Sequence, residues 1–309
     1  MPQQKMRLDQ WKQARTFLQQ HARPLEWQLF RFRFEEGAPR DVLDALEPFS
    51  NSDGGFGNAL EPDVRTPSSS ALATALALRI LDELQSAIAG DRIRIAIHYL
   101  IDSFEEDLQA WRVVPTDTNT YPHAPWWHDE EGSLLTAFDG FRIIPRALVL
   151  GLLHRYRTAV PTRWLDRLTD ATLLHIDSLD VLGEGGGSDL EYVSFLAQTP
   201  GVPGQERLIA RVRQAVAETV SRDSSEWSSY CITPLKAAPT PRTPGAEQIA
   251  DLVDRQIVHL LETQAESGCW NPTWSWFGAY PEAWELAKRE WQGIITLDTL
   301  TSLRAYGAA

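Results

Sequence analysis

Three carboxylates stand close together in one turn-rich segment, residues 51–67, which reads NSDGGFGNALEPDVRTP. They are Asp53, Glu61 and Asp63, and Arg65 follows two residues after the last of them. Carboxyl groups that share a dry site cannot all ionise, so one of them keeps its proton and can act as a general acid. The segment therefore offers a catalytic acid, with Asp63 or Glu61 as the first candidates and Asp53 as the third.

The same segment also has the features of a helix start. Thr66 is a suitable N-cap, and Pro67 is a suitable first helical residue. A helix amino terminus favours the ionised form of a carboxylate, which suits an anchoring role for Asp63 beside Arg65 and opposes proton donation. A catalytic loop and a structural cap both remain open, and they are compatible, because loops before the inner helices of a helical barrel line one mouth.

A second candidate segment, YPHAPWWHDEEG, begins at Tyr121 and is stiffened by two prolines. Its adjacent Trp126 and Trp127 are costly to expose, which favours a cavity wall or a lid over packing in a helical core. His123 could pass a proton or orient a carboxylate, and His128 is a further ligand-binding candidate. A metal site is not favoured, because the spacing of histidines in a loop sets no ligand geometry.

The third candidate segment, WNPTWSWFGAYPEAW, begins at Trp270 and is rich in aromatic residues. Such side chains can stabilise a cation through their ring faces or stack on sugar rings. We expect Trp274, Trp276 and Tyr280 to contact a ligand, whereas packing of the last repeat onto the first accounts for Trp270 and Trp291.

Composition excludes several classes of partner. The chain has 309 residues, twelve of them Trp, and a net charge of −13, which disfavours nucleic acid as a partner. The amino-terminal residues lack the apolar region of a signal peptide, and the longest apolar run is far short of the roughly 18 residues of a membrane span. With two cysteines and no CxxC spacing, no zinc site is indicated. We expect a soluble cytoplasmic protein without a metal or cofactor, and its oligomeric state stays open.

Apolar spacing is helical along nearly the whole chain, which predicts an all-α protein. The stretch SSSALATALALRILDEL, which begins at Ser68, is apolar on nearly every face, as a helix buried on both sides would be. Amphipathic outer helices around such inner helices are typical of an α/α barrel. In the turn before this helix, Gly54 and Gly55 are expected at positive φ. Burial is expected along the inner helix at Leu72, Leu76, Ile80 and Leu84.

A weak internal repeat supports the barrel. Helices end in turns that carry an aromatic residue, at Phe56, Trp111, Trp227 and Trp270. About six units of roughly 50 residues would fill the chain, which predicts an (α/α)6 toroid of about twelve helices in one domain, residues 1–309. The GEGGG run at Gly183 is interpreted as a flexible turn, and the proline-rich PTPRTP as a loop, with a domain linker as the alternative.

The chain resembles the terpenoid cyclase and protein prenyltransferase superfamily of α/α toroids. DGGFG and HLLETQAESGCW resemble its QW-type repeats, and three longer stretches look like a group of small bacterial proteins assigned to it: DGGFGNALEPDVRTPSSSALAT, YPHAPWW, and WNPTWSW together with REWQGIITLDTLTSLRAYG. Its motifs are incomplete here. There is no DxDD acid motif and no DDxxD run, and Arg65 follows Asp63 and Val64 where a zinc-binding cysteine would stand.

The resemblance implies an aromatic-lined central cavity that accepts an apolar or amphipathic small molecule. The favoured hypothesis is a metal-independent, cyclase-like enzyme directed at isoprenoids, with Asp63 or Glu61 as the acid. The alternatives are a carbohydrate-active α/α barrel that uses two carboxylates, as a hydrolase or a lyase, and a non-catalytic binding scaffold. The enzyme hypothesis predicts that Asp63 shares a pocket with His123 and with Trp126 or Trp127. The substrate-binding candidates are Arg65, Trp126, Trp127, His128, Trp274, Trp276 and Tyr280.

Overall fold

The computed structural model describes residues 4–130, 143–183 and 185–309. Within these ranges the predicted all-α class is confirmed, with one short antiparallel hairpin of β1 (Phe104–Glu105) and β2 (Ala110–Trp111). None of the described helices is long and apolar enough to cross a membrane. The described α-helices are α1 (Leu8–His21), α2 (Pro24–Phe34), α3 (Pro39–Leu46), α4 (Ala71–Glu83), α5 (Gly90–Asp102), α7 (Arg146–Arg155), α8 (Thr162–Ser178), α9 (Ser188–Ala197), α10 (Gln205–Thr219), α11 (Pro234–Ala237), α12 (Ala250–Thr263) and α13 (Pro281–Ala305).

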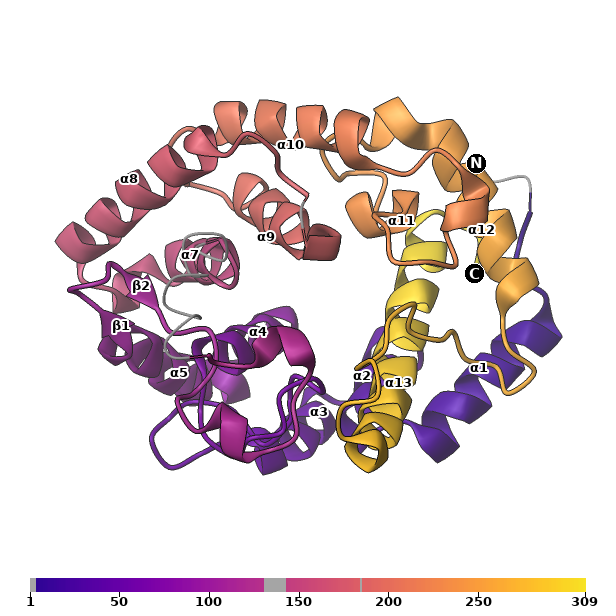
Figure 1. Ribbon diagram of the computed structural model, residues 1–309, viewed down its shortest axis with the longest axis horizontal. Coiled ribbons are helices and arrows are strands. Elements are labelled where there is room, and N and C mark those ends of the chain that lie inside the picture. Colours follow the sequence, from indigo (N-terminus) through magenta and orange to yellow (C-terminus); the bar gives the residue numbers. More distant parts are fainter. Residues whose placement is uncertain (1–3, 131–142, 184) are drawn as a thin grey trace.

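The helices follow one another around a ring-like outline, and the chain returns to its starting point (Figure 1). Helices α8 and α10 lie on the outer side of this outline, with α7 and α9 inside them. The first helix, α1, packs against the last, α13, and the N–H of Met6 donates a hydrogen bond to the carbonyl of Ala308 (2.7 Å). The two ends of the fold are thus held together by side-chain packing and by the backbone.

Helix α4 begins later than the sequence predicts. Its N-cap is Ser70, whose hydroxyl accepts a hydrogen bond from the N–H of Ala73 (3.0 Å). The prediction of Thr66 as the N-cap is wrong, because the chain stays extended through Ser70, where it pairs with Phe56. Thr66 instead donates its hydroxyl hydrogen to Asp117 (3.0 Å), which fixes the loop to a neighbouring segment.

Burial along α4 differs from the predicted stripe. Leu72 and Leu84 are buried, but Leu76 and Ile80 are only half-buried, so the prediction is wrong for those two. Leu76 contacts both hydrophobic clusters of the protein, and the side chain of Arg79 on the same helix is exposed. One face of α4 is therefore not sealed by neighbouring helices, although small alanines let its other faces pack closely against α5 and α7.

The three tryptophans that mark the repeat have a common structural role. The indole N–H of Trp111 donates to the carbonyl of Leu100 in α5 (2.6 Å), and that of Trp270 donates to Leu260 in α12 (2.9 Å). Trp227 is also buried, and its indole N–H donates to the carbonyl of Ser221, just after α10 (3.0 Å). Each indole satisfies a carbonyl at or near the end of the preceding helix, which would otherwise lack an intrahelical partner.

The two glycines of the Asp53 turn are required for different reasons. Gly54 has φ +89°, as predicted, a conformation that a residue with a side chain rarely adopts. Gly55 does not have positive φ, so that prediction is wrong. A Cβ at Gly55 would instead lie 2.6 Å from the Cβ of Ser69 and 2.7 Å from the ring of Tyr99. Close packing, and not backbone conformation, requires this second glycine.

Truncation of the sealed face of α4 should be costly. Leu78 is fully buried, so Leu78→Ala should lower the free energy of unfolding by roughly 2–5 kcal/mol, because it leaves a cavity. Leu174→Ala on α8, where the side chain is 72% exposed, is the matched control and should change it by no more than about 0.5 kcal/mol. Urea unfolding followed by circular dichroism measures both. Equal losses for the two variants would contradict this assignment of the core.

Candidate functional site

The loop between α3 and α4 is organised by its own polar side chains. One oxygen of Asp53 accepts hydrogen bonds from the N–H of Gly55 (3.0 Å) and from the hydroxyl of Ser69 (2.8 Å). In the described residues Asp53 forms no hydrogen bond with Glu61 or Asp63. The structure therefore places this predicted catalytic candidate within its own turn, where it orders the loop.

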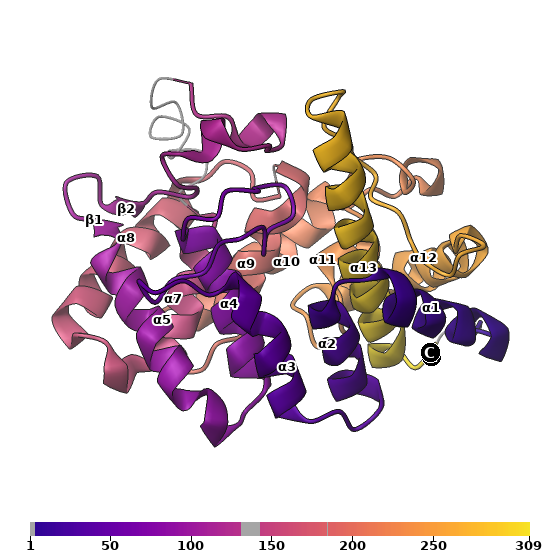
Figure 2. The ribbon, with the colours of Figure 1, turned by 90° about the horizontal axis from the view of Figure 1, so that it is seen from below.

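The loop around Asp63 pairs with the loop that contains His123. Val64 forms a β-bridge with His123, and the N–H of Ala124 donates to the carbonyl of Asp63 (2.8 Å). The hairpin of β1 and β2 precedes the His123 loop. It lies at the same end of the molecule as the amino end of α13 (Figure 2). The two loops that the sequence predicts to meet are thus side by side, although about sixty residues separate them.

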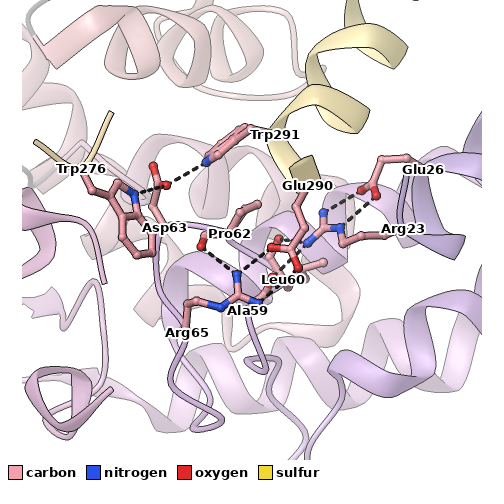
Figure 3. A network of polar contacts seen from close by, with 10 residues as sticks. All are labelled: Arg23, Glu26, Ala59, Leu60, Pro62, Asp63, Arg65, Trp276, Glu290 and Trp291. Atoms are coloured by element: carbon pink, nitrogen blue, oxygen red, sulfur yellow. Dashed lines mark hydrogen bonds and ion pairs between the residues drawn. The ribbon is translucent and has the colours of Figure 1, made fainter. Parts of the chain in front are cut away.

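Asp63 is buried and accepts hydrogen bonds from two indoles. The N–H groups of Trp276 and Trp291 both donate to its Oδ1 at 2.8 Å (Figure 3). The other oxygen, Oδ2, accepts no hydrogen bond from the residues that the structure describes. Burial raises the pKa of Asp63, and the hydrogen bonds from Trp291 and Trp276, with a further contribution from Trp274, oppose that rise. Neutral donors therefore stabilise a carboxylate that has no cation in direct contact.

Glu61 lies two residues from Asp63 in the same desolvated loop. Burial, followed by the negative charge of Asp63, raises the pKa of Glu61 to about 8, while Arg23 opposes the rise. Its carboxyl group forms no ion pair with the described residues, and the residue lines a small recess together with Leu60 and Leu72. At neutral pH Glu61 therefore keeps its proton for most of the time.

Two arginines flank the carboxyl pair, but each is engaged with another acid. Arg65 forms a bidentate ion pair with Glu290 of α13, at 2.7 and 3.2 Å. Arg23 forms one with Glu26 in α2, at 2.7 and 2.9 Å, and also donates to two carbonyls of the loop (Figure 3). Because these guanidinium groups are largely neutralised, they leave the pKa of Glu61 high. Arg65, predicted to bind substrate, is thus placed in a half-buried ion pair.

His123 has a defined tautomer. Its Nδ1 lies 2.7 Å from the carbonyl of Tyr121 and must therefore donate, so Nε2 accepts a hydrogen bond from Nδ1 of His128 at 3.0 Å. The two imidazoles are stacked, and the ring of Tyr280 lies 5.5 Å from His123. No hydrogen bond joins His123 to Glu61 or Asp63 in the described part of the chain.

The tryptophans of the two aromatic segments divide into a buried and an exposed set. Trp127 is buried in one hydrophobic cluster with Trp276 and Val64, next to Asp63. Trp126 and Tyr280 are exposed. Trp274 packs edge-on against Trp291, with ring centroids 5.0 Å apart. The buried set therefore limits the access of water to the carboxyl pair.

Charged side chains also cross the interior of the helical ring. Arg79 of α4 forms an ion pair with Glu191 of α9 at 2.5 Å, past the intervening helix α7. Asp298 of α13 lies 3.9 Å from Arg33 of α2, which itself forms a bidentate pair with Glu83. The Asp298 side chain is 69% exposed, yet desolvation raises its pKa to about 6. Solvent therefore reaches the Asp298 side chain although the surrounding protein disfavours its ionised form. The charges of Glu191 and Arg79 also act on Asp298, and we refer to these three residues as the charged cluster.

The charges of the carboxyl pair act on two tyrosines. Burial, and then the charges of Glu191 and Glu61, raise the pKa of Tyr192 on α9. Burial, and then the charges of Asp189 and Asp63, raise the pKa of Tyr230. The phenols of both tyrosines therefore lie within electrostatic range of the two candidate acids.

Sequence reasoning missed several residues of this site. Glu290 was not singled out, Trp291 was assigned to packing, and Arg23 was overlooked. No local signal in the sequence marks these residues, because their contacts with the loop join segments far apart along the chain. No group of three or more histidine, cysteine, aspartate or glutamate side chains in the described ranges could hold a metal ion.

The raised pKa of Glu61 has a consequence for stability. The folded state keeps a proton that the unfolded chain releases, so this contribution is complete below the ordinary pKa of 4.5 and is lost as pH rises through about 8. Glu61→Gln cannot lose a proton. The Tm of Glu61→Gln minus the Tm of the wild type should therefore increase as the pH rises from about 5 to about 8.5. Asp91→Asn is the control, because the Asp91 side chain is 88% exposed. If the Tm difference between Glu61→Gln and the wild type does not change with pH, the raised pKa of Glu61 is contradicted.

Comparison with protein-family models, with curated proteins and with solved structures found no match to this chain. The function must therefore be argued from the site itself. That site consists of two neighbouring carboxyl groups, an enclosure of indoles and a charged cluster within electrostatic range.

Proposed function

We propose that the helices form an (α/α)6 toroid in which each inner helix is backed by an outer one. The packing of α1 against α13 supports closure of the ring. Further support comes from α7 and α9, which pack against each other inside α8 and α10 (Figure 1). The ion pair between Arg79 and Glu191 is consistent with inner helices that surround a common interior.

We propose that Glu61 and Asp63 are the acid and base of an enzyme. The observation that carries this proposal is a desolvated pair of carboxyl groups in which Glu61 has a pKa of about 8. Glu61 donates a proton to the substrate, and the carboxylate of Asp63, held by two indoles, stabilises positive charge or accepts a proton. A purely structural role would engage all three loop carboxylates. Asp53 is engaged within its own turn and Asp63 by two indoles, whereas Glu61 forms no ion pair with the described residues.

The substrate class that best suits this site is carbohydrate. Sugars are bound by charged side chains that donate and accept hydrogen bonds, and by aromatic rings that stack on the sugar face. The charged cluster supplies Arg79, Glu191 and Asp298, while Trp126 and Tyr280 are exposed near the carboxyl pair. The chain would then act as a hydrolase or a lyase on a carbohydrate, with Glu61 as the proton donor.

An isoprenoid cyclase remains the second candidate. The three indoles of Trp274, Trp276 and Trp291 around Asp63 favour it, because ring faces stabilise carbocations. The charged cluster disfavours it. A hydrocarbon chain would remove water from Asp298 and Arg79 without replacing the hydrogen bonds to that water.

Incubation with a panel of substrates separates these candidates. Neutral and acidic oligosaccharides form one half of the panel, and squalene, linear prenyl alcohols and prenyl diphosphates form the other, with products followed by mass spectrometry. Cleavage of an oligosaccharide supports the carbohydrate proposal, and a cyclised isoprenoid replaces it with the second candidate. If neither half gives a product, the proposal of an enzyme is rejected.

Substitution of the carboxyl pair tests its role in turnover. Glu61→Gln and Asp63→Asn should each lower kcat by about 100-fold or more, because they remove the proton donor and the charge opposite it. Trp126→Ala should instead raise KM, because it removes an exposed stacking surface. Asp91→Asn, which changes an exposed side chain on α5, should leave kcat and KM unchanged. Unfolding of Asp63→Asn at room temperature would assign that residue to structure and not to catalysis.

A further inference from the structure

A strained turn directly precedes Glu61. The N–H of Leu60 donates to the carbonyl of Gly57 (3.0 Å), and the two residues between them, Asn58 and Ala59, have φ of +53° and +60°. Positive φ at both central positions is typical of a type I′ turn, which favours asparagine at the first position and glycine at the second. Alanine at the second position is unfavourable, because its Cβ crowds the backbone in this conformation. Contacts from outside the turn must therefore stabilise it.

Arg23 of α2 supplies such contacts. Its Nη1 donates to the carbonyl oxygens of Ala59 (3.0 Å) and Leu60 (3.1 Å), and we refer to these two hydrogen bonds as the clamp (Figure 3). Its Nε and Nη2 donate to the two carboxylate oxygens of Glu26. The guanidinium also lies over the ring of Phe49, 5.3 Å from the centroid. The orientation of Nη1 toward both carbonyls is therefore fixed by an ion pair and by an aromatic ring.

This geometry requires an arginine. A planar guanidinium carries its N–H donors at fixed angles, so one edge can bind a carboxylate while the remaining nitrogen binds two carbonyls. A lysine has a single nitrogen and cannot make the same four hydrogen bonds. The side chains of Arg23 and Glu26 are only 10% and 4% exposed, so water competes little for these contacts. Arg23→Lys therefore keeps the positive charge near Glu26 and loses the clamp.

The charge of Arg23 and the clamp act on Glu61 in opposite directions. A positive charge favours the carboxylate, and Arg23 does oppose the rise in the pKa of Glu61 that burial causes. The clamp holds Glu61 in its desolvated position, which raises the same pKa. Loss of the charge alone would therefore raise the pKa of Glu61, whereas loss of the clamp would lower it. Asp63, the other charge that acts on Glu61, is the same in every variant considered below.

We propose that Arg23 is a positioning residue for Glu61. Its hydrogen bonds to the carbonyls of Ala59 and Leu60 keep the turn at positive φ. The turn places Glu61 in the small recess that it lines together with Leu60 and Leu72. Arg23 acts through the backbone and not by contact with a ligand. The role of Glu61 as a catalytic acid rests on the proposed function, whereas its positioning by Arg23 does not.

An NMR titration of the full chain tests the clamp without any turnover. With ¹³C-labelled glutamate, one carboxyl resonance should titrate near pH 8 and be missing from Glu61→Gln. In Arg23→Lys its midpoint should fall by about one pH unit or more, because Glu61 becomes hydrated. Adding Ala59→Gly should return the midpoint toward 8, since glycine adopts positive φ without the clamp. Arg40→Lys, at a 72% exposed side chain on α3, is the control and should titrate as the wild type does.

Each outcome decides for or against the clamp. A midpoint that stays or rises in Arg23→Lys, a fall that Ala59→Gly does not reverse, or a wild-type midpoint near 4.5 would overturn it. If Arg23→Lys does not fold, Arg23→Met combined with Glu26→Leu removes the buried ion pair as a unit, which proteins often tolerate. In that variant a lower midpoint supports the clamp and a higher one overturns it.

The titration also separates this inference from the proposed function. If no substrate is turned over and the midpoint falls in Arg23→Lys, the proposed chemistry fails and the positioning role of Arg23 stands. If an oligosaccharide is cleaved and the midpoint does not fall, the positioning role fails and the proposed chemistry stands.

Discussion

Two carboxyl groups, those of Glu61 and Asp63, share a desolvated loop, and neither forms an ion pair with the described residues. This arrangement would be unfavourable for two ionised groups, and it is maintained because one of them stays protonated. The arginines that could neutralise it are paired with Glu26 and Glu290. The protonation state of Glu61 therefore depends on two ion pairs to which Glu61 itself does not belong.

An aromatic enclosure lies near a cluster of charged side chains. The indoles near Asp63 exclude water and supply N–H donors, while Arg79, Glu191 and Asp298 remain in contact with water. The first environment raises the pKa of a proton donor, and the second compensates the hydrogen bonds that a polar ligand loses on leaving solution. The charge of Glu61 acts on Tyr192 of α9, which is next to Glu191 in the sequence, so the two environments influence each other electrostatically.

Local sequence patterns predicted the helical class and the adjacency of the loops at Asp63 and His123. They failed where several neighbouring residues satisfy the same local rule. Thr66 and Ser70 are both good N-caps, and only pairing of Ser70 with Phe56 decides between them. They also could not predict partners of Asp63 from α13, because those contacts depend on closure of the ring and not on spacing along the chain.

The hydrogen bond between Asp63 and Trp291 spans 228 residues of sequence. During synthesis on the ribosome, the loop of Asp63 emerges long before the helix that covers it. Contacts of such high sequence separation form late, since a large loop must close first. The burial of the carboxyl pair is consequently incomplete in any nascent or truncated chain that lacks α13. The raised pKa of Glu61 is therefore a property of the complete fold and not of the loop that carries it.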